Sequence, residues 1–168
     1  MKIVNIKADK LRYQANSLAY SFCLLGLALG VTGLFTLVTY DAFGAGDAPS
    51  RVVPDFRIGL EIAVSIVMML LTFLAAEKAK SYDPLWSTFG LFLLASVTLL
   101  RIADFGTAYQ GITHYCFDRG WIPAAVQTKA TVMFFASALF LFAAAIVSTV
   151  RVVILHRHLK EIGRHGNA

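Results

Sequence analysis

The sequence predicts an all-α protein, a bundle of four transmembrane helices with both termini on the cytoplasmic side. Three observations predict this fold. Hydrophobic residues make up 58% of the 168-residue chain, with a mean hydropathy of +0.68. The apolar residues gather in four long runs, and the basic residues gather at the two ends of the chain and in one connecting segment. Soluble domains carry more charge than the 15% found here.

Each apolar run is long enough to cross a membrane. A hydrocarbon core about 30 Å thick is crossed by about 20 apolar helical residues, and only closed backbone hydrogen bonding is tolerated inside it. We expect helices over about residues 10–40, 55–78, 84–105 and 124–162 of a single integral membrane domain, 1–168. The apolar runs at their centres are Leu18–Tyr40, Ile58–Ala76, Leu85–Ala103 and Ala130–Val150.

The positions of the basic residues predict the orientation of the helices. Most of them fall in the two terminal segments and after the second helix, which share one side if four helices cross. By the positive-inside rule that side is the cytoplasm, so we expect a multi-pass protein of the inner (plasma) membrane. Basic residues near lipid headgroups also argue against nucleic acid as a partner. These residues are Lys2, Lys7, Lys10, Arg12, Lys78, Lys80, Arg151, Arg157, Lys160 and Arg164.

The first helix is predicted to stay in the mature protein. The stretch from Tyr13 to Tyr40 contains no charge. That is much longer than the 7–15 apolar residues of a signal peptide.

The third helix has a clear start signal, and the fourth helix is predicted to be long. Asp83 followed by Pro84 is typical of an N-cap and a first helical residue. Beyond the fourth apolar run, Val152, Leu155, Leu159 and Ile162 recur at spacings of three or four among basic residues, which predicts a cytoplasmic extension. This extension is either interfacial, with snorkelling basic side chains, or a docking arm for a partner. Its basic residues are Arg151, Arg157, Lys160 and Arg164.

The segment between the third and fourth helices is too aromatic for a fully solvated loop. Tyr109, Tyr115, Phe117 and Trp121 fall within it, and amphipathic rings favour the headgroup layer. We expect it to lie along the outer membrane surface or to fold over the bundle, where it could form a lid. Its Cys116 is expected to be accessible to an impermeant thiol reagent and to form no disulfide with Cys23, which lies in the first helix.

A stripe of small residues marks the first helix as a packing surface. Spacings of 4, 3, 4 and 3 place five small side chains on one helical face, and such a face lets another helix approach closely in lipid. The packing partner is the second or fourth helix of the same chain, or another protein. The fourth helix has a complementary seven-residue repeat of small residues. The stripe consists of Ala19, Cys23, Gly26, Gly30 and Gly33.

Three ionisable residues lie at membrane depth near the outer ends of the second and third helices. A partly dehydrated charge is costly unless it is paired, so we expect Glu61, Arg101 and Asp104 to form one charge cluster. The cluster can be a structural clamp between two helices, a substrate or proton site, or a contact with a charged group of a partner.

The sequence offers no catalytic constellation and no metal or cofactor site. His156 and His158 are two residues apart and so point to different sides of a helix, and His114 with Cys116 supplies only two ligands. We therefore expect no enzyme activity and no cofactor.

Two segments resemble those of small, uncharacterised four-helix membrane proteins of bacteria. They are Arg12–Asn16, which leads into the first helix, and Leu74–Tyr82, which follows the second. The resemblance implies no activity. From the stripe, the long last helix and the aromatic segment, we expect a non-catalytic accessory or structural subunit of a larger bacterial membrane complex, such as a transporter. The alternative is a small homo-oligomeric transporter or channel with the charge cluster at its outer mouth.

Overall fold

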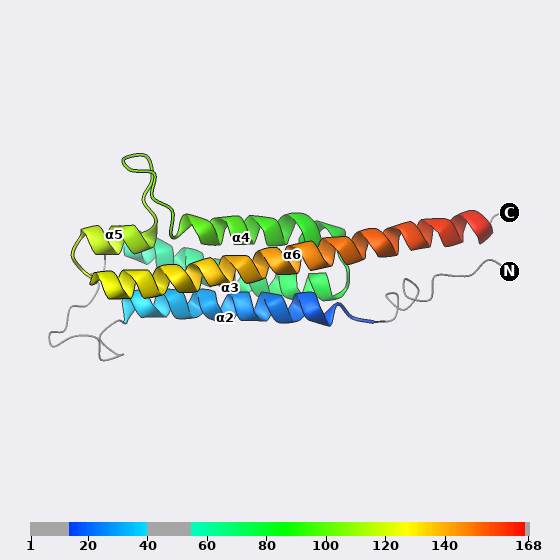
Figure 1. Cartoon of the computed structure of the whole chain (residues 1–168), viewed down its shortest axis with the longest axis horizontal. Helices are drawn as coiled ribbons and strands as arrows, with labels where there is room; N and C mark the ends of the chain where they lie inside the picture. Colours follow the sequence, from blue (N-terminus) through cyan, green and yellow to red (C-terminus); the bar gives the residue numbers. More distant parts are fainter. Residues whose placement is uncertain (1–13, 40–54, 167–168) are drawn as a thin grey trace.

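The computed structural model describes residues 14–39 and 55–166, with side chains up to Ile162. The described part is helical and contains no strand, only an isolated bridge between Asp104 and Gln110. Figure 1 shows three long helices and a shorter one packed side by side. The elements are α2 (Ser17–Val38), α3 (Phe56–Lys80), the π-helical turn η2 (Trp86–Gly90) continued by α4 (Leu91–Leu100), α5 (Ile112–Asp118) and α6 (Ala124–Gly166).

Three helices are long and apolar enough to cross a membrane: α2, α3 and α6. They indicate a membrane protein. The η2–α4 segment is shorter, because the helix expected over 84–105 ends at Leu100. The first helix begins at Ser17 rather than near residue 10, and residues 10–13 and 40 of the expected range lie outside the described residues.

The bundle has two ends with different cores. At the end where α2 begins, small side chains such as Cys23, Ala75 and Ala144 let the helices approach closely. At the other end, larger side chains such as Leu37, Ile112 and Phe134 join α5 to the bundle. We call these the terminal end and the α5 end. The most extensive pairing in the molecule, between α2 and α6, runs along both.

Asn16 joins three helices at the terminal end. Its side chain is fully buried, donates to Ser148 Oγ at 3.3 Å and accepts from Arg151 Nη1 at 2.8 Å, both on α6. Its backbone N–H donates to the carbonyl of Lys80, at the end of α3, at 3.1 Å. Nearby, Asp83 caps the next helix as predicted, since its carboxylate accepts from the backbone N–H groups of Leu85 and Trp86.

Beyond Arg151, α6 extends past the described ends of the other helices, and His158 on this part is buried. At 1.5 Å per residue, its 43 residues extend about 64 Å, roughly twice the thickness of a hydrocarbon core. Residues 152–166 therefore continue the helix for about 22 Å past the contact with Asn16, and Figure 1 shows this part projecting in line with the bundle. We call it the α6 extension.

Candidate functional site

Arg101 is buried at the end of the short helix α4. The helical residues from Pro84 to Leu100 extend about 25 Å, less than the thickness of a hydrocarbon core. The residue that follows, Arg101, lies between α3 and α6 and is 7% exposed. The sequence predicts Arg101 near the outer end of the third helix, and in the structure it directly follows Leu100, the last residue of α4.

Arg101 joins α4 to α3 through two side chains. Its Nε lies 3.1 Å from Glu61 Oε1, and its Nη2 donates to Ser65 Oγ at 2.9 Å. Ser65 in turn donates to the backbone carbonyl of Glu61 at 2.7 Å. The guanidinium also lies 5.2 Å from the ring centre of Phe134 on α6. Arg101 thus contacts residues of both neighbouring helices.

The ion pair does not use the full hydrogen-bonding capacity of its atoms. Glu61 Oε1 and Arg101 Nε are buried and near each other, but neither has an aligned hydrogen bond. Removing two charges from water is costly, and that cost is offset only when geometry is good and the remaining donors and acceptors are satisfied. Glu61 Oε1 and Arg101 Nε are therefore left without a well-aligned hydrogen bond inside the bundle.

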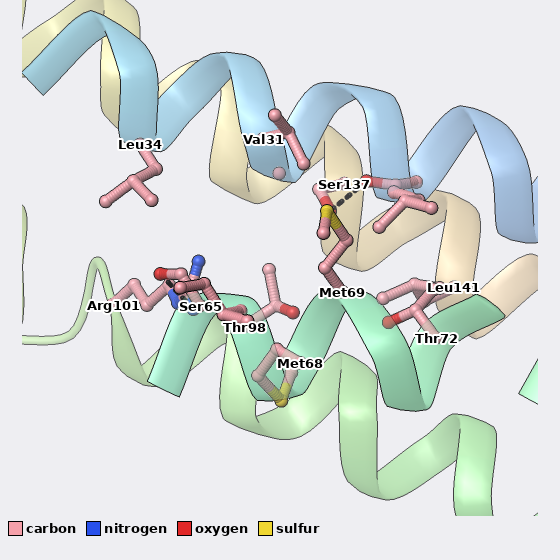
Figure 2. A pocket seen from close by; sticks show the side chains of 14 residues that line it. Val31, Leu34, Ser65, Met68, Met69, Thr72, Thr98, Arg101, Ser137 and Leu141 are labelled. Atoms are coloured by element: carbon pink, nitrogen blue, oxygen red, sulfur yellow. Dashed lines mark hydrogen bonds between the residues drawn. The ribbon is translucent and has the colours of Figure 1, made fainter. Parts of the chain in front are cut away.

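A cavity of about 110 Å³ adjoins Arg101 and Ser65. We call it the bundle cavity. Figure 2 shows the guanidinium of Arg101 beside Ser65 at one end and Thr72 beside Leu141 toward the other. The walls come from four helices: Gly26, Leu27, Gly30, Val31 and Leu34 of α2; Ser65, Ile66, Met68, Met69 and Thr72 of α3; Thr98 and Arg101 at the end of α4; and Ser137 and Leu141 of α6.

Four hydroxyl groups line the bundle cavity. Three of them donate to helix carbonyls: Ser65 to Glu61 at 2.7 Å, Thr98 to Leu94 at 2.8 Å and Ser137 to Gly26 at 2.5 Å. Their oxygens keep lone pairs for a further donor. The fourth, on the buried Thr72, has no hydrogen bond to the described part of the chain.

The segment after α4 folds over the end of the bundle and caps the short helix. The last carbonyls of a helix have no partner within it. Here Tyr109 Oη donates to the carbonyl of Leu100 at 3.0 Å, and Thr113 Oγ1 donates to that of Arg101 at 3.1 Å. A Cβ on Gly111 would lie 2.5 Å from the Arg101 carbonyl oxygen, so only glycine fits this approach.

Asp104 does not join the charge cluster. Its carboxylate lies 4.0 Å from His114 Nδ1 and accepts from the backbone N–H of Gly106 at 2.9 Å. The expected proximity to Arg101 assumed three residues of continuous helix. The helix ends at Leu100, so Asp104 lies instead on an exposed turn.

A surface cluster holds α5 against the start of α3. The hydroxyl of Tyr115 donates to Asp55 Oδ2 at 2.5 Å, and Asp55 Oδ1 accepts from the N–H of Ile58 at 2.8 Å. These bonds lower the pKa of the Asp55 carboxyl, with the Tyr115 bond contributing most, and the same bond raises the pKa of Tyr115. Arg57 and Arg119 stack on the Tyr115 ring.

The small-residue stripe faces α6 of the same chain. A Cβ added to Gly26 would lie 3.0 Å from Leu141, and one added to Gly33 would lie 3.2 Å from Phe134. Gly30 faces Ser137 in the same way, at 3.1 Å. Ala19 and Cys23, which complete the stripe, are fully buried. Of the partners left open by the sequence, the structure places α6 against these residues.

The basic residues of the last helix have different surroundings. Arg151 belongs to the Asn16 network. Arg157 and Lys160 are exposed on the α6 extension, while Arg164 is in the helix with its side chain outside the described set.

Cys116 is less accessible than expected. It is fully buried in α5, and burial raises the pKa of its thiol to about 12. A thiol that stays protonated reacts slowly, so Cys116 is a poor site for an impermeant reagent. Cys23 is buried in the other core cluster.

Sequence reasoning missed Asn16, Ser65, Thr72 and Thr98. Ser65 lies four residues after Glu61, on the same helical face, and this spacing could have identified it. The other three carry no sequence signal that separates them from ordinary hydroxyl and amide residues. Among the described residues, no three His, Cys, Asp or Glu side chains converge as metal ligands.

Comparisons with family models, with curated proteins and with solved structures find no match to this chain.

Proposed function

We propose that this protein is a non-catalytic accessory subunit of a larger bacterial membrane complex, such as a transporter, and that the α6 extension contacts the partner. The observation that carries the proposal is the exposed apolar surface of this extension. Val153, Ile154, Leu159 and Ile162 are between 39% and 43% exposed, on a helix that projects away from the bundle.

The direction of the helix favours a protein partner over the membrane surface. An interfacial helix lies in the plane of the membrane, with its apolar side in the acyl region. The α6 extension instead continues in line with the bundle, so if the bundle crosses the membrane this surface lies in water. Apolar side chains in water are stabilised by contact with another protein.

The topology that goes with this proposal has four crossings, with the shorter η2–α4 segment as the third. The start of α2 and the end of α6 lie at the same end of the bundle, as an even number of crossings requires. Lys78, Lys80, Arg157 and Lys160 are near that end, so the positive-inside rule assigns it to the cytoplasm of the plasma membrane.

Purification of the tagged protein from its native host in mild detergent tests the proposal. We expect a larger membrane protein to co-purify in fixed ratio, and the double variant Ile154→Ala and Leu159→Ala to lose most of it. The matched control is Leu70→Ala with Leu93→Ala, which truncates two exposed apolar side chains on the bundle itself. Equal recovery of the partner with both variants would refute the role of the extension.

A second candidate is a small homo-oligomeric transporter or channel. The observation that favours it is the Arg101–Glu61 pair beside the bundle cavity, because transport sites form between helices where ionisable groups are held inside the membrane. The same purification distinguishes the two, since this candidate predicts a symmetric homo-oligomer without a second protein.

A further inference from the structure

We propose that the bundle cavity binds the head of an uncharged lipid-soluble molecule, one with a hydroxyl or carbonyl group at the end of an apolar chain. The proposal does not depend on a partner subunit. It follows from where the cavity opens, from the hydrogen-bonding groups inside it and from its size.

The bundle cavity is reached from the apolar surface of the bundle. Val31 of α2 and Ile66 and Met69 of α3 line it and are 44%, 52% and 39% exposed, so its mouth lies between these two helices. In a membrane this surface faces acyl chains. A ligand would enter sideways from the bilayer.

The interior offers donors and acceptors that the protein leaves unused. The hydroxyl of Thr72 can donate, and the oxygens of Thr98 and Ser137 can accept. Buried polar groups of this kind are normally paired in native structures. A plain acyl chain would leave the Thr72 hydroxyl unpaired, whereas a hydroxyl or carbonyl group can accept a hydrogen bond from it.

The charge inside the site favours an uncharged ligand. Arg101 already has Glu61 as its counter-ion at 3.1 Å, so the two formal charges cancel. A carboxylate or phosphate head would be repelled by Glu61 or would have to displace it. A cationic head would be repelled by Arg101 or would have to displace it from Glu61.

The size of the cavity limits how much of the ligand enters. A dry cavity of about 150 Å³ takes one benzene molecule. The bundle cavity, at about 110 Å³, has room for a head of a few heavy atoms. The apolar chain would then leave through the mouth and remain in the bilayer beside Ile66 and Met69.

Three photoreactive probes test this proposal in phosphatidylcholine nanodiscs. They share one alkyl chain with a diazirine near one end, and that end carries a hydroxyl group, a carboxylate or no polar group. We expect the alcohol to label α2 and α3 at the cavity-lining residues, with competition by unlabelled hexadecanol. Equal labelling by the hydrocarbon, or stronger labelling by the carboxylate, would overturn the proposal.

Two pairs of variants locate the binding. Met69→Trp blocks the mouth and should abolish labelling by the alcohol, while Leu70→Trp, on the adjacent lipid-facing position, should leave it unchanged.

Thr72→Val removes the free hydroxyl and should weaken binding about fivefold, the effect of one neutral hydrogen bond. Its control is Thr32→Val, at an exposed threonine on α2. Unchanged labelling in both Met69→Trp and Thr72→Val would show that the alcohol binds elsewhere.

Discussion

Two buried polar clusters, one around Asn16 at the terminal end and one around Arg101 at the α5 end, are hydrogen-bonded to different degrees. At the terminal end, the side-chain amide and the backbone of Asn16 all have partners, on α2, α3 and α6. At the α5 end, Arg101 and Glu61 are charged, close together and incompletely hydrogen-bonded, and a cavity adjoins them. A fully satisfied network rigidifies a core, whereas a partly satisfied one leaves groups available to a ligand. Asn16 therefore serves helix packing, whereas the surroundings of Arg101 leave room for the proposed ligand. The contrast holds for these two clusters, because Tyr82 Oη and Ser87 Oγ at the terminal end are also buried without a hydrogen bond.

Removal of Arg101 should have the largest effect. Arg101→Ala leaves Glu61 buried without a counter-ion, which should lower the free energy of unfolding by about 3–5 kcal/mol. Chemical unfolding of the purified protein in detergent measures it. Arg119→Ala, which removes an exposed arginine stacked on Tyr115 and Trp121, should cost at most about 1 kcal/mol.

A double variant distinguishes a clamp from a binding role of the same pair. Arg101→Met with Glu61→Leu removes both charges and should recover most of the lost stability, because apolar replacements of a buried pair are often neutral. The double variant should still lose labelling by the alcohol probe. Recovery of both stability and labelling would show that the pair contributes nothing to the site.

Loss of the Asn16 amide should have a smaller effect at the terminal end. Asn16→Ala leaves Ser148 and Arg151 without their partner and should lower the free energy of unfolding by about 1–3 kcal/mol. Labelling by the alcohol probe should not change, because Asn16 does not line the bundle cavity. The control Gln14→Ala, at an exposed position two residues earlier, should stay within about 0.5 kcal/mol. A loss of labelling in Asn16→Ala would contradict the separation of the two ends.

The long helices could be predicted from the sequence because length and hydropathy are local properties. The end of α4 could not. Ile102 and Ala103 continue the apolar pattern of the helix, yet the final carbonyls accept from Tyr109 and Thr113, and only the tertiary structure brings these residues there. The error carried over to Asp104, whose expected place beside Arg101 depended on a helix that stops at Leu100.

Only one part of the candidate site could be predicted from the sequence, the pairing of Glu61 with Arg101. It follows from the free-energy cost of an unpaired charge in an apolar bundle. The bundle cavity depends on how four helices fail to fill the space between them, and no single segment encodes that. Asn16 shows a similar limit. It stands at the N-cap position of α2, but its side chain makes no capping bond and reaches α6 instead.

The surface of the α5 end should give the smallest effect, and one that depends on pH. The hydrogen bond from Tyr115 keeps the pKa of Asp55 below its ordinary value of 3.8, so the folded state binds a proton less readily than the unfolded state. This contribution to stability is complete above pH 3.8 and is lost as the pH falls through the lower pKa of the folded protein. The difference in unfolding temperature between the wild type and Tyr115→Phe should therefore shrink in acid.

The control for this titration is Tyr109→Phe. Its hydroxyl donates to the backbone carbonyl of Leu100, a group that does not titrate, so its difference from the wild type should stay constant over the same acid range. A Tyr115→Phe difference that also stays constant would mean that the tyrosine stabilises α5 by ring stacking with Arg57 and Trp121 rather than through the carboxylate. The contact between α5 and the start of α3 would then depend on the face of the Tyr115 ring and not on its hydroxyl.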